Sequence, residues 1–123
     1  MKISAVIISF NEEANIGRCI DSLLPVADEI VVVDSFSTDK TEEICLQRGA
    51  RFIKNQFKGH IQQKNFALEQ ALYDFVLALD ADEYLSKELI SSIREVKING
   101  VHQAYNMNRL SSYQGKWIHV TDW

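Results

Sequence analysis

The sequence of 123 residues predicts an α/β protein with a mostly parallel open sheet and helices on both faces. Two observations lead to this fold class. Short apolar runs rich in β-branched residues alternate with segments whose apolar residues recur at helical spacing, which implies right-handed crossovers between parallel strands. The length and the 46% hydrophobic content suit a single domain over residues 1–123 with one modest core.

The chain opens with a predicted strand, a tight turn and a helix. Residues 3–10, ISAVIISF, form a continuous apolar run that is typical of a strand covered on both faces. Asn11 is a good capping residue type for the following segment, EEANIGRCIDSLLP. That segment has acidic residues in its first turn and Pro25 at its end. Its apolar residues recur at helical spacing: Ile16, Ile20, Leu23 and Leu24.

Three further pairs of strand and helix follow. The strands are expected at EIVVVD (residues 29–34), ARFIKN (residues 50–55) and DFVLALD (residues 74–80). The helices are expected at STDKTEEICLQRG (residues 37–49), HIQQKNFALEQAL (residues 60–72) and SKELISSIREVK (residues 86–97). Asp39 and Ser86 are the expected caps of the first and last of these helices. HQAYNMNRL, residues 102–110, is a further candidate strand.

Polar residues stand where three of the predicted strands end. They are Asn11 after the first strand, Asp34 at the end of the second, and Asp80 and Asp82 at the end of the fourth. Because ligands of parallel sheets bind at the carboxyl ends of the strands, we expect these side chains to share one crevice. Asn11 and Asp34 also have structural interpretations, as a helix cap and as the start of a turn.

The stretch FVLALDADEYL ends an apolar strand in three nearby carboxylates, Asp80, Asp82 and Glu83. Residues two apart in an extended segment point to the same side, so Asp80 and Asp82 can meet one ligand. A hard cation with oxygen ligands explains two convergent acids better than a solvated turn does. Glu83 is expected to face away, either as an exposed carboxylate or as a partner that supports the metal ligands.

A cation alone leaves Asp34 unexplained. A carboxylate at a strand end is also how open sheets bind a ribose hydroxyl, and Phe10 lies at the same edge, where it can stack on a base. These features predict a nucleoside diphosphate, with the cation neutralising its phosphates. The first turn, SFNEEANIG, lacks GxGxxG, and no Walker sequence is present, which disfavours dinucleotide oxidoreductases and P-loop enzymes.

Composition restricts the partners and the compartment. A formal net charge of −4 and a pI near 5.3 argue against nucleic acid as the main partner. The sequence has no apolar segment of membrane-spanning length and no signal-peptide layout at its start, so we expect a cytoplasmic protein. Cys19 and Cys45 fit no zinc or redox spacing and are expected to be buried free thiols.

Three motifs resemble those of family 2 inverting glycosyltransferases with the GT-A fold. They are AVIISFNEEANIGRCIDSL, EIVVVDSFSTDKTEEI and LALDADEYL, the last being of the DxD type. The resemblance covers nearly the whole chain and implies the Rossmann-like nucleotide-binding half of that fold. NRLSSYQGKWI further resembles the branch of lipopolysaccharide-core glucosyltransferases. The resemblance implies transfer of a sugar from a nucleotide-diphosphate sugar, a UDP-sugar, to a lipopolysaccharide, another glycan or a lipid-linked acceptor, with Mg²⁺ or Mn²⁺ as cofactor.

Carried over position by position, the resemblance assigns a donor site. The nucleobase and ribose end would comprise Phe10, Asn11, Glu13 and Asp34. Asp80 and Ala81 would lie at the ribose or diphosphate, and Asp82 is similar to the residue that holds the metal, with Asp80 as a second metal ligand. Lys64, in QQKNFAL, would lie near the donor phosphates, and its alternative role is that of a solvated helix lysine.

The sequence departs from the family pattern after the DxD motif. In this family an acidic general base, which deprotonates the acceptor hydroxyl, lies in the half that follows. His119 and Asp122 stand in no recognisable acceptor-site motif, and His60 and His102 are expected to be surface or packing residues, so the catalytic base is left unassigned. We therefore expect a donor-binding domain truncated at its C-terminus. The alternative function is a nucleotide-sugar binding module without turnover.

A third and less favoured function is that of a sugar-nucleotide pyrophosphorylase, which would need a Gly-rich N-terminal loop that SFNEEAN does not supply. Truncation would leave an unpaired sheet edge and uncovered apolar residues, so we expect self-association through the C-terminal third as a homo-oligomer. The residues concerned are Tyr105, Met107, Tyr113, Trp117 and Trp123. We also expect peripheral contact with the inner face of the membrane.

Overall fold

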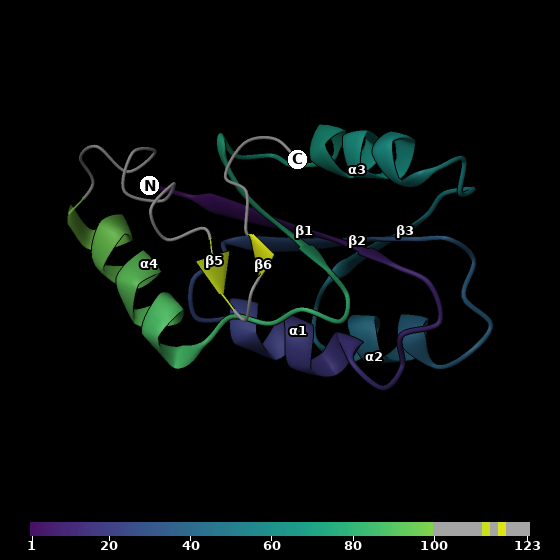
Figure 1. Ribbon diagram of the computed structural model, residues 1–123, viewed down its shortest axis with the longest axis horizontal. Helices are drawn as coiled ribbons and strands as arrows, with labels where there is room; N and C mark the ends of the chain where they lie inside the picture. The colour runs from purple at the N-terminus through teal and green to yellow at the C-terminus, as the bar shows by residue number, and fades with distance from the viewer. Residues whose placement is uncertain (100–111, 114–115, 118–123) are drawn as a thin grey trace.

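The computed structural model describes residues 1–99, 112–113 and 116–117, and in it four parallel strands form one open sheet (Figure 1). The strands are β1 (Ile3–Ser9), β2 (Glu29–Asp34), β3 (Arg51–Lys54) and β4 (Phe75–Asp80). Their order across the sheet is β3-β2-β1-β4, and every neighbouring pair is parallel. The predicted α/β class and the parallel sheet are confirmed.

Helices cover both faces of this sheet, as the alternating sequence pattern predicted. They are α1 (Ile16–Leu23), α2 (Thr41–Gln47), α3 (His60–Glu69) and α4 (Lys87–Asn99). Figure 1 shows α3 on one side of the sheet and α1, α2 and α4 on the other. The core is accordingly divided into two clusters, one beneath α1, α2 and α4 and a smaller one beneath α3.

The strand sequences are apolar on both faces because each face is covered by helices. All seven residues of β1 are buried, with Ile3, Ala5 and Ile7 in the larger cluster. Val6 and Ile8 alternate with them and belong to the smaller cluster. Continuous apolar runs of this kind are the signature of a parallel sheet.

The β1–α1 connection differs from the sequence prediction. Asn11 adopts a left-handed backbone with φ of 51°, and α1 begins only at Ile16, so Asn11 is not its cap and no acidic residue lies in its first turn. Hydrogen bonds to a segment distant in the sequence cause this difference. The backbone N–H of Glu12 donates to Thr41 Oγ1 at the start of α2, and that of Glu13 donates to Asp39 in the β2–α2 loop, so the segment forms a turn there before α1 begins.

Ser86 is confirmed as a cap by its hydrogen bond, whereas the N-cap position of α2 is Lys40, and Asp39, one residue earlier, bonds the start of that helix with its side chain. Asp39 Oδ1 accepts the backbone N–H of Thr41, the first residue of α2, at 3.0 Å. Ser86 Oγ accepts the N–H of Leu89 at 3.1 Å near the start of α4. Each bond satisfies a donor that the helix itself leaves without a partner.

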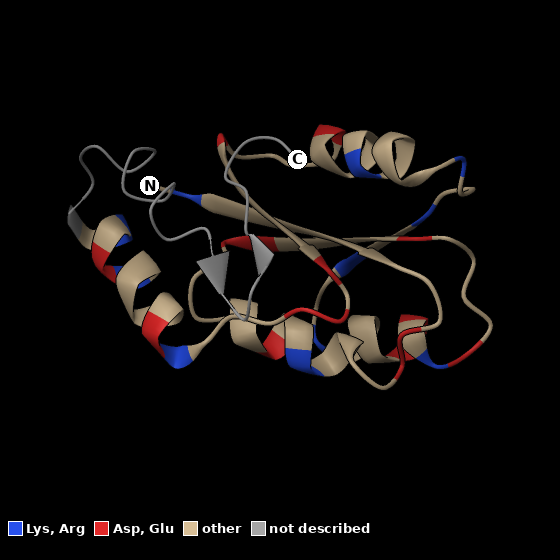
Figure 2. Ribbon diagram, in the orientation of Figure 1, with Lys and Arg blue, Asp and Glu red and all other residues tan. Residues whose placement is uncertain are grey.

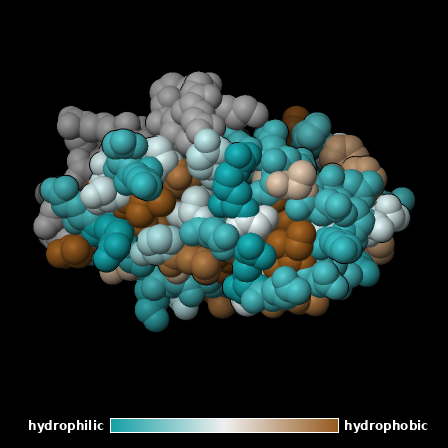
Figure 3. All heavy atoms as spheres, turned by 90° about the horizontal axis from the view of Figure 1, so that it is seen from below, coloured by the Kyte–Doolittle hydropathy of each residue, from teal (hydrophilic) through white to brown (hydrophobic). Residues whose placement is uncertain are grey.

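The surface of the described residues is polar and mixed in charge. Figure 3 shows the side of α1, α2 and α4 as hydrophilic with separate apolar patches. Lys and Arg are scattered over the described elements, and Figure 2 shows no concentration of them on one face. None of the described helices is both long and apolar enough to cross a bilayer.

Two short antiparallel strands, β5 (Ser112–Tyr113) and β6 (Lys116–Trp117), are the described elements after α4. The candidate strand at residues 102–110 and the residues His102, His119 and Asp122 lie outside the described part of the chain. Self-association through the C-terminal third and the truncated extent of the domain therefore stay predictions.

Both cysteines are buried and free within the described structure, as predicted. Burial, reinforced by the negative charge of Asp34, raises the pKa of the Cys45 thiol to about 12. Burial also raises the pKa of the Cys19 thiol, with Glu83 as the largest charge contribution. Neither thiol is poised for nucleophilic chemistry.

Candidate functional site

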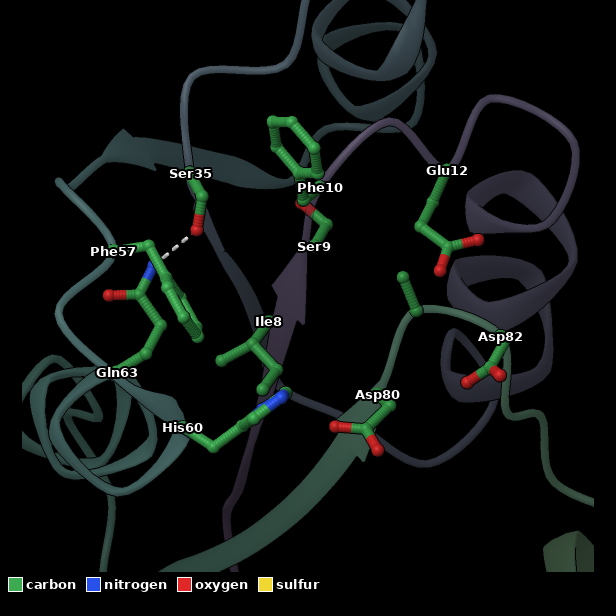
Figure 4. Close-up of a pocket in the computed structure, with 11 residues that line it drawn as sticks. Ile8, Ser9, Phe10, Glu12, Ser35, Phe57, His60, Gln63, Asp80 and Asp82 are labelled. Carbon is green, nitrogen blue, oxygen red and sulfur yellow. Dashed lines mark hydrogen bonds between the residues drawn. The ribbon is translucent and has the colours of Figure 1, made fainter.

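A cavity of about 250 Å³ lies at the carboxyl ends of β1 and β4 (Figure 4). At this position the strand order reverses. β2 and β3 extend the sheet on one side of β1, and β4 adds to it on the other side. Ligands of open parallel sheets bind at such a reversal. The lining residues are Ile8, Ser9, Phe10, Glu12, Ser35, Phe57, His60, Gln63, Asp80, Ala81 and Asp82.

The turn after β4 brings Asp80 and Asp82 into this cavity. Ala81, between them, is buried in the larger core cluster, and its N–H donates to the carbonyl of Ile8 at 3.1 Å. That bond pins the turn to β1. Asp80 is half-buried and Asp82 is exposed, and Figure 4 shows the Asp80 carboxylate directed toward His60 of α3 and Asp82 on the far side of the cavity, near Glu12. The structure therefore places the two acids of the DxD motif in one site.

Glu83 is buried, with 8% of its surface exposed, so the expectation of an exposed carboxylate is wrong. Its Oε1 accepts the backbone N–H of Asp80 at 2.7 Å, and its own N–H donates to the carbonyl of Asp80 at 2.9 Å. The turn closes on itself in this way because Ala81 must enter the core. Glu83 thus supports the backbone that carries Asp80, which agrees with its alternative role as a supporting partner.

Asp34 lies next to the cavity and is almost completely buried, with 1% exposed. Its carboxylate accepts hydrogen bonds from Ser9 Oγ at 2.7 Å, Ser37 Oγ at 2.5 Å and Ser37 N–H at 2.6 Å. These bonds organise the turn after β2, as the structural interpretation proposed. The cavity is lined at this point by Ser35. Contact between Asp34 and a base or ribose stays a prediction.

The predicted nucleobase residues of the first turn separate into two groups. Phe10 lines the cavity and is 57% exposed. The side chains of Asn11 and Glu13 instead hold the β2–α2 loop, because Asn11 Oδ1 accepts the N–H of Thr38 and Glu13 Oε1 accepts the N–H of Lys40. Neither lines the cavity. Glu12 does, and sequence reasoning did not single it out.

Asp39 secures the same loop from its other side. Oδ2 of Asp39 accepts the N–H of Glu13 at 3.1 Å, and Oδ1 accepts both donors of Thr41. Desolvation acts to raise its pKa, but these hydrogen bonds outweigh it, so the pKa of Asp39 lies below its usual value. Asp39 is therefore a structural acid that fixes the rim of the site.

Helix α3 contributes His60 and Gln63 to the cavity, whereas Lys64 does not line it. His60 is exposed and packs edge-to-face on Phe57 with 5.3 Å between ring centroids, as a surface or packing residue, but it also faces the cavity. Gln63, like Glu12, lines the cavity and was not predicted from the sequence. Successive side chains of a helix point in directions about 100° apart. The sequence alone did not determine which of Gln63 and Lys64 faces the cavity.

The donor atoms of the site suit a hard divalent cation. Asp80 and Asp82 offer carboxylate oxygens, which Mg²⁺ and Mn²⁺ prefer. Among the residues that the structure describes, no group of three or more His, Cys, Asp or Glu side chains could hold a metal ion. A cation at this site would thus be held by one or two carboxylates, with ligand oxygens and water completing its coordination.

Comparison with known proteins identifies relatives of this chain. The family model described as Glycosyl transferase family 2 matches residues 4–118. An uncharacterized glycosyltransferase of Rickettsia felis is 44% identical over 117 residues, which are 95% of this chain and 40% of that protein. The lipopolysaccharide core biosynthesis glycosyltransferase LpsC of Rhizobium meliloti is 43% identical over 101 residues, 78% of this chain and 37% of that protein. The chain thus spans about 40% of the length of the relatives it matches.

Solved structures resemble the described fold at lower sequence identity than these relatives. Glucosyl-3-phosphoglycerate synthase from Mycobacterium tuberculosis, in complex with Mn²⁺, UDP and glucosyl-3-phosphoglycerate, superposes with a TM-score of 0.60 at 31% identity. That match covers 68% of this chain and 35% of the synthase. Residues 1–349 of TarS from S. aureus give a TM-score of 0.62 at 31% identity, covering 80% of this chain and 33% of that one.

Proposed function

The chain belongs to glycosyl transferase family 2, and on that premise we propose that it binds the nucleotide-sugar donor of a sugar transferase. The donor is a UDP-sugar held with Mg²⁺ or Mn²⁺, and the acceptor is a lipopolysaccharide or another glycan. One observation carries the proposal: Asp80 and Asp82 lie in one cavity with Phe10, at the carboxyl ends of β1 and β4.

The relatives support both the ligand class and the acceptor class. The mycobacterial synthase, whose fold this chain shares, has been crystallised with UDP and Mn²⁺ and with UDP and Mg²⁺. LpsC is named for lipopolysaccharide core biosynthesis. An acceptor of that kind agrees with the resemblance of NRLSSYQGKWI to lipopolysaccharide-core enzymes.

We assign the cavity residues by the chemistry of the donor. Phe10, more than half exposed at the cavity, offers an aromatic face to the nucleobase. Asp82 and Asp80 offer oxygens to the metal, and Ala81 lies between them at the ribose and diphosphate. When bound, the metal neutralises the charge of the diphosphate leaving group.

The remaining assigned residues do not line this cavity in the described structure. Asn11, Glu13 and Asp34 lie in or against the loops that form its rim, and Lys64 follows Gln63 on α3. Asp34 and Asn11 reach the base or ribose only if their present hydrogen bonds to the β2–α2 loop rearrange. Lys64 reaches the phosphates by extending across α3 from the position beside Gln63.

The reaction is a direct displacement with inversion. The acceptor hydroxyl forms a bond to the anomeric carbon, the bond from that carbon to the diphosphate oxygen breaks, and a base takes the hydroxyl proton. The three acids that line the cavity are Glu12, Asp80 and Asp82. Two of them are assigned to the donor, so the described residues support donor binding more strongly than they support the proton transfer.

That observation favours a second candidate function, donor binding without turnover by this chain. Two measurements separate the candidates. Titration calorimetry with UDP in the presence of Mg²⁺ or Mn²⁺ tests donor binding, and release of UDP from a UDP-sugar with a lipopolysaccharide acceptor tests transfer. Binding with acceptor-dependent release supports the transferase, whereas binding alone supports the second candidate. Absence of metal-dependent UDP binding would contradict both.

We further propose a cytoplasmic protein with peripheral contact to the inner face of the membrane. The support is chemical, because a lipid-linked acceptor is presented at a membrane surface. Co-sedimentation with vesicles that carry such an acceptor tests the contact, and vesicles without the acceptor are the control.

A further inference from the structure

Helix α1 is joined to the segment that follows Asp82 by two side-chain contacts. Arg18 places its guanidinium over the ring of Tyr84, with 4.2 Å between Cζ and the ring centroid, a distance typical of a cation–π contact. Ser22 Oγ accepts the backbone N–H of Leu85 at 3.0 Å. Figure 1 shows this segment running beside α1 on its way from β4 to α4. The helix therefore holds the backbone on the C-terminal side of Asp82.

The backbone on the N-terminal side of Asp82 is held by other elements. The N–H of Ala81 donates to the carbonyl of Ile8 in β1 at 3.1 Å, and Glu83 Oε1 accepts the N–H of Asp80 at 2.7 Å. Asp82 itself is exposed, and within residues 1–99 its carboxylate makes no hydrogen bond. Its side chain is thus placed by the backbone on either side of it, one side held by β1 and the other by α1.

Two carboxylates that meet one cation need such support. Before the cation binds, the negative charges of Asp80 and Asp82 repel each other. If the turn were free to open, part of the binding free energy of the cation would be spent on closing it again. A turn that its neighbours already hold in the binding geometry avoids that cost.

Arg18 also connects this turn to the turn after β1. One of its N–H groups donates to Asn15 Oδ1 at 3.3 Å, and Asn15 Nδ2 donates to Glu12 Oε1 at 2.9 Å. A guanidinium can only donate, so the carbonyl end of the Asn15 amide faces Arg18 and its NH₂ group faces Glu12. Glu12 lines the cavity, and Figure 4 shows it near Asp82. Arg18 therefore lies between the two turns that carry the acids of the cavity.

We propose that Arg18 is a positioning residue for the cation site. Stacked on Tyr84, it holds the end of the turn so that Asp82 stays within reach of the cation that Asp80 meets. Arg18 touches no ligand atom in this arrangement. The inference rests on the proposed function, because it assumes that UDP binds at these two carboxylates together with a divalent cation.

The decisive experiment measures UDP affinity by titration calorimetry at limiting and at saturating Mn²⁺, for the wild type and for Arg18→Ala. At limiting Mn²⁺ we expect Arg18→Ala to bind UDP about two- to fivefold more weakly, the effect of one cation–π contact. Saturating Mn²⁺ should recover most of the loss, because excess metal compensates for a poorly held ligand. Arg48→Ala is the matched control, since Arg48 is a partly exposed arginine that bonds Asp21 on the same helix.

Variants of Tyr84 test whether Arg18 acts through the aromatic ring. Tyr84→Leu removes the ring and should show the same Mn²⁺-dependent loss as Arg18→Ala, whereas Tyr84→Phe keeps the ring and should retain most of the affinity. The double variant Arg18→Ala/Tyr84→Leu should lose no more than either single variant. Additive losses would show that the two residues act separately and would overturn the proposal.

The other outcomes are distinct. A loss in Arg18→Ala that saturating Mn²⁺ does not recover would assign Arg18 to the nucleotide and overturn its role at the cation site. Wild-type affinity at both Mn²⁺ concentrations, with a lowered melting temperature, would reduce the contact to a structural tie between α1 and the turn. If the wild type showed no metal-dependent UDP binding, the proposed function itself would be contradicted before any variant was compared.

Discussion

The carboxylate of Glu83 is bonded to the backbone of Asp80, the residue that ends β4. Glu83 Oε1 accepts the Asp80 N–H at 2.7 Å, and the N–H of Glu83 returns a bond to the Asp80 carbonyl at 2.9 Å. Since Glu83 is buried, this pair closes the turn that presents Asp80 and Asp82 to the cavity. A third acid in the motif thus acts on its neighbours rather than on a ligand.

Glu83→Ala should weaken metal-dependent UDP binding by about 1–2 kcal/mol, because the Asp80 N–H loses its buried acceptor and the turn loosens. Glu83→Gln keeps a carbonyl oxygen at the same position and should retain most of the affinity. Titration calorimetry with Mg²⁺ would measure both. If the glutamine variant bound as weakly as the alanine variant, the negative charge rather than the hydrogen bond would be what matters.

Asp82→Asn should abolish the metal dependence of UDP binding, because an amide oxygen is a much weaker ligand of a hard cation than a carboxylate. Calorimetry with Mg²⁺, with Mn²⁺ and with a chelator would show it. Asp74→Asn is the matched control, since Asp74 is exposed and precedes β4 at the opposite end of the strand. Metal-dependent binding of wild-type strength in Asp82→Asn would rule out the assignment.

Asp34→Ala should weaken UDP by about 1–3 kcal/mol, the loss expected when charge-assisted hydrogen bonds disappear. Stability should fall as well, because the same carboxylate holds Ser9 and Ser37. Denaturant unfolding and calorimetry on the same sample separate the two effects. A loss of stability with unchanged UDP affinity in the folded fraction would leave Asp34 as a residue of the turn alone.

The Asp28–Lys97 pair should make stability depend on pH. Partial burial acts to raise the pKa of Asp28, but hydrogen bonds from Lys97 Nζ at 2.6 Å and from the Ile3 N–H outweigh it, so the pKa of Asp28 lies below its usual value. A lowered folded-state pKa gives stability that is present above the unfolded pKa of about 3.9 and is lost as pH falls through the folded pKa.

Asp28→Asn should therefore cost about 0.5–1 kcal/mol at pH 7, a modest value because the pair is partly exposed to solvent. The cost should shrink toward zero when unfolding is measured near pH 3, about one unit below the unfolded pKa. Chemical denaturation at the two pH values provides the measurement. A difference that stays constant between them would assign the effect to packing instead of charge.

Cys19 and Cys45 should react with a thiol reagent only after unfolding. Both side chains are buried, and the pKa of Cys45 is raised to about 12, so at pH 8 the folded protein contains almost no thiolate at that position. Reagent uptake in buffer and in denaturant would be compared. Fast labelling in buffer would mean that α1 or α2 opens readily.

Much of the fold followed from the sequence because local pattern and tertiary environment agree. The apolar runs at residues 29–34 and 74–80 could be buried on both faces only by a parallel sheet with helices on each side, and both lie within one residue of the observed strands. The DxD pair could be placed at the carboxyl edge for the same reason. The spacing of apolar residues, which identifies the strands and helices, and the parallel topology of the sheet together bring such residues to one crevice.

Tertiary contacts decided which side chains enter that crevice. Asn11 has the chemistry of a cap, but hydrogen bonds to the β2–α2 loop hold it in a left-handed turn, so α1 begins at Ile16. Glu83 became buried because Ala81 between it and Asp80 packs in the core. On α3 the buried face is fixed by packing of Ala67 beneath the sheet, and this turns Gln63 rather than Lys64 toward Ser35. A sequence specifies the residue types at a strand end, but the direction of each side chain depends on partners distant in the chain.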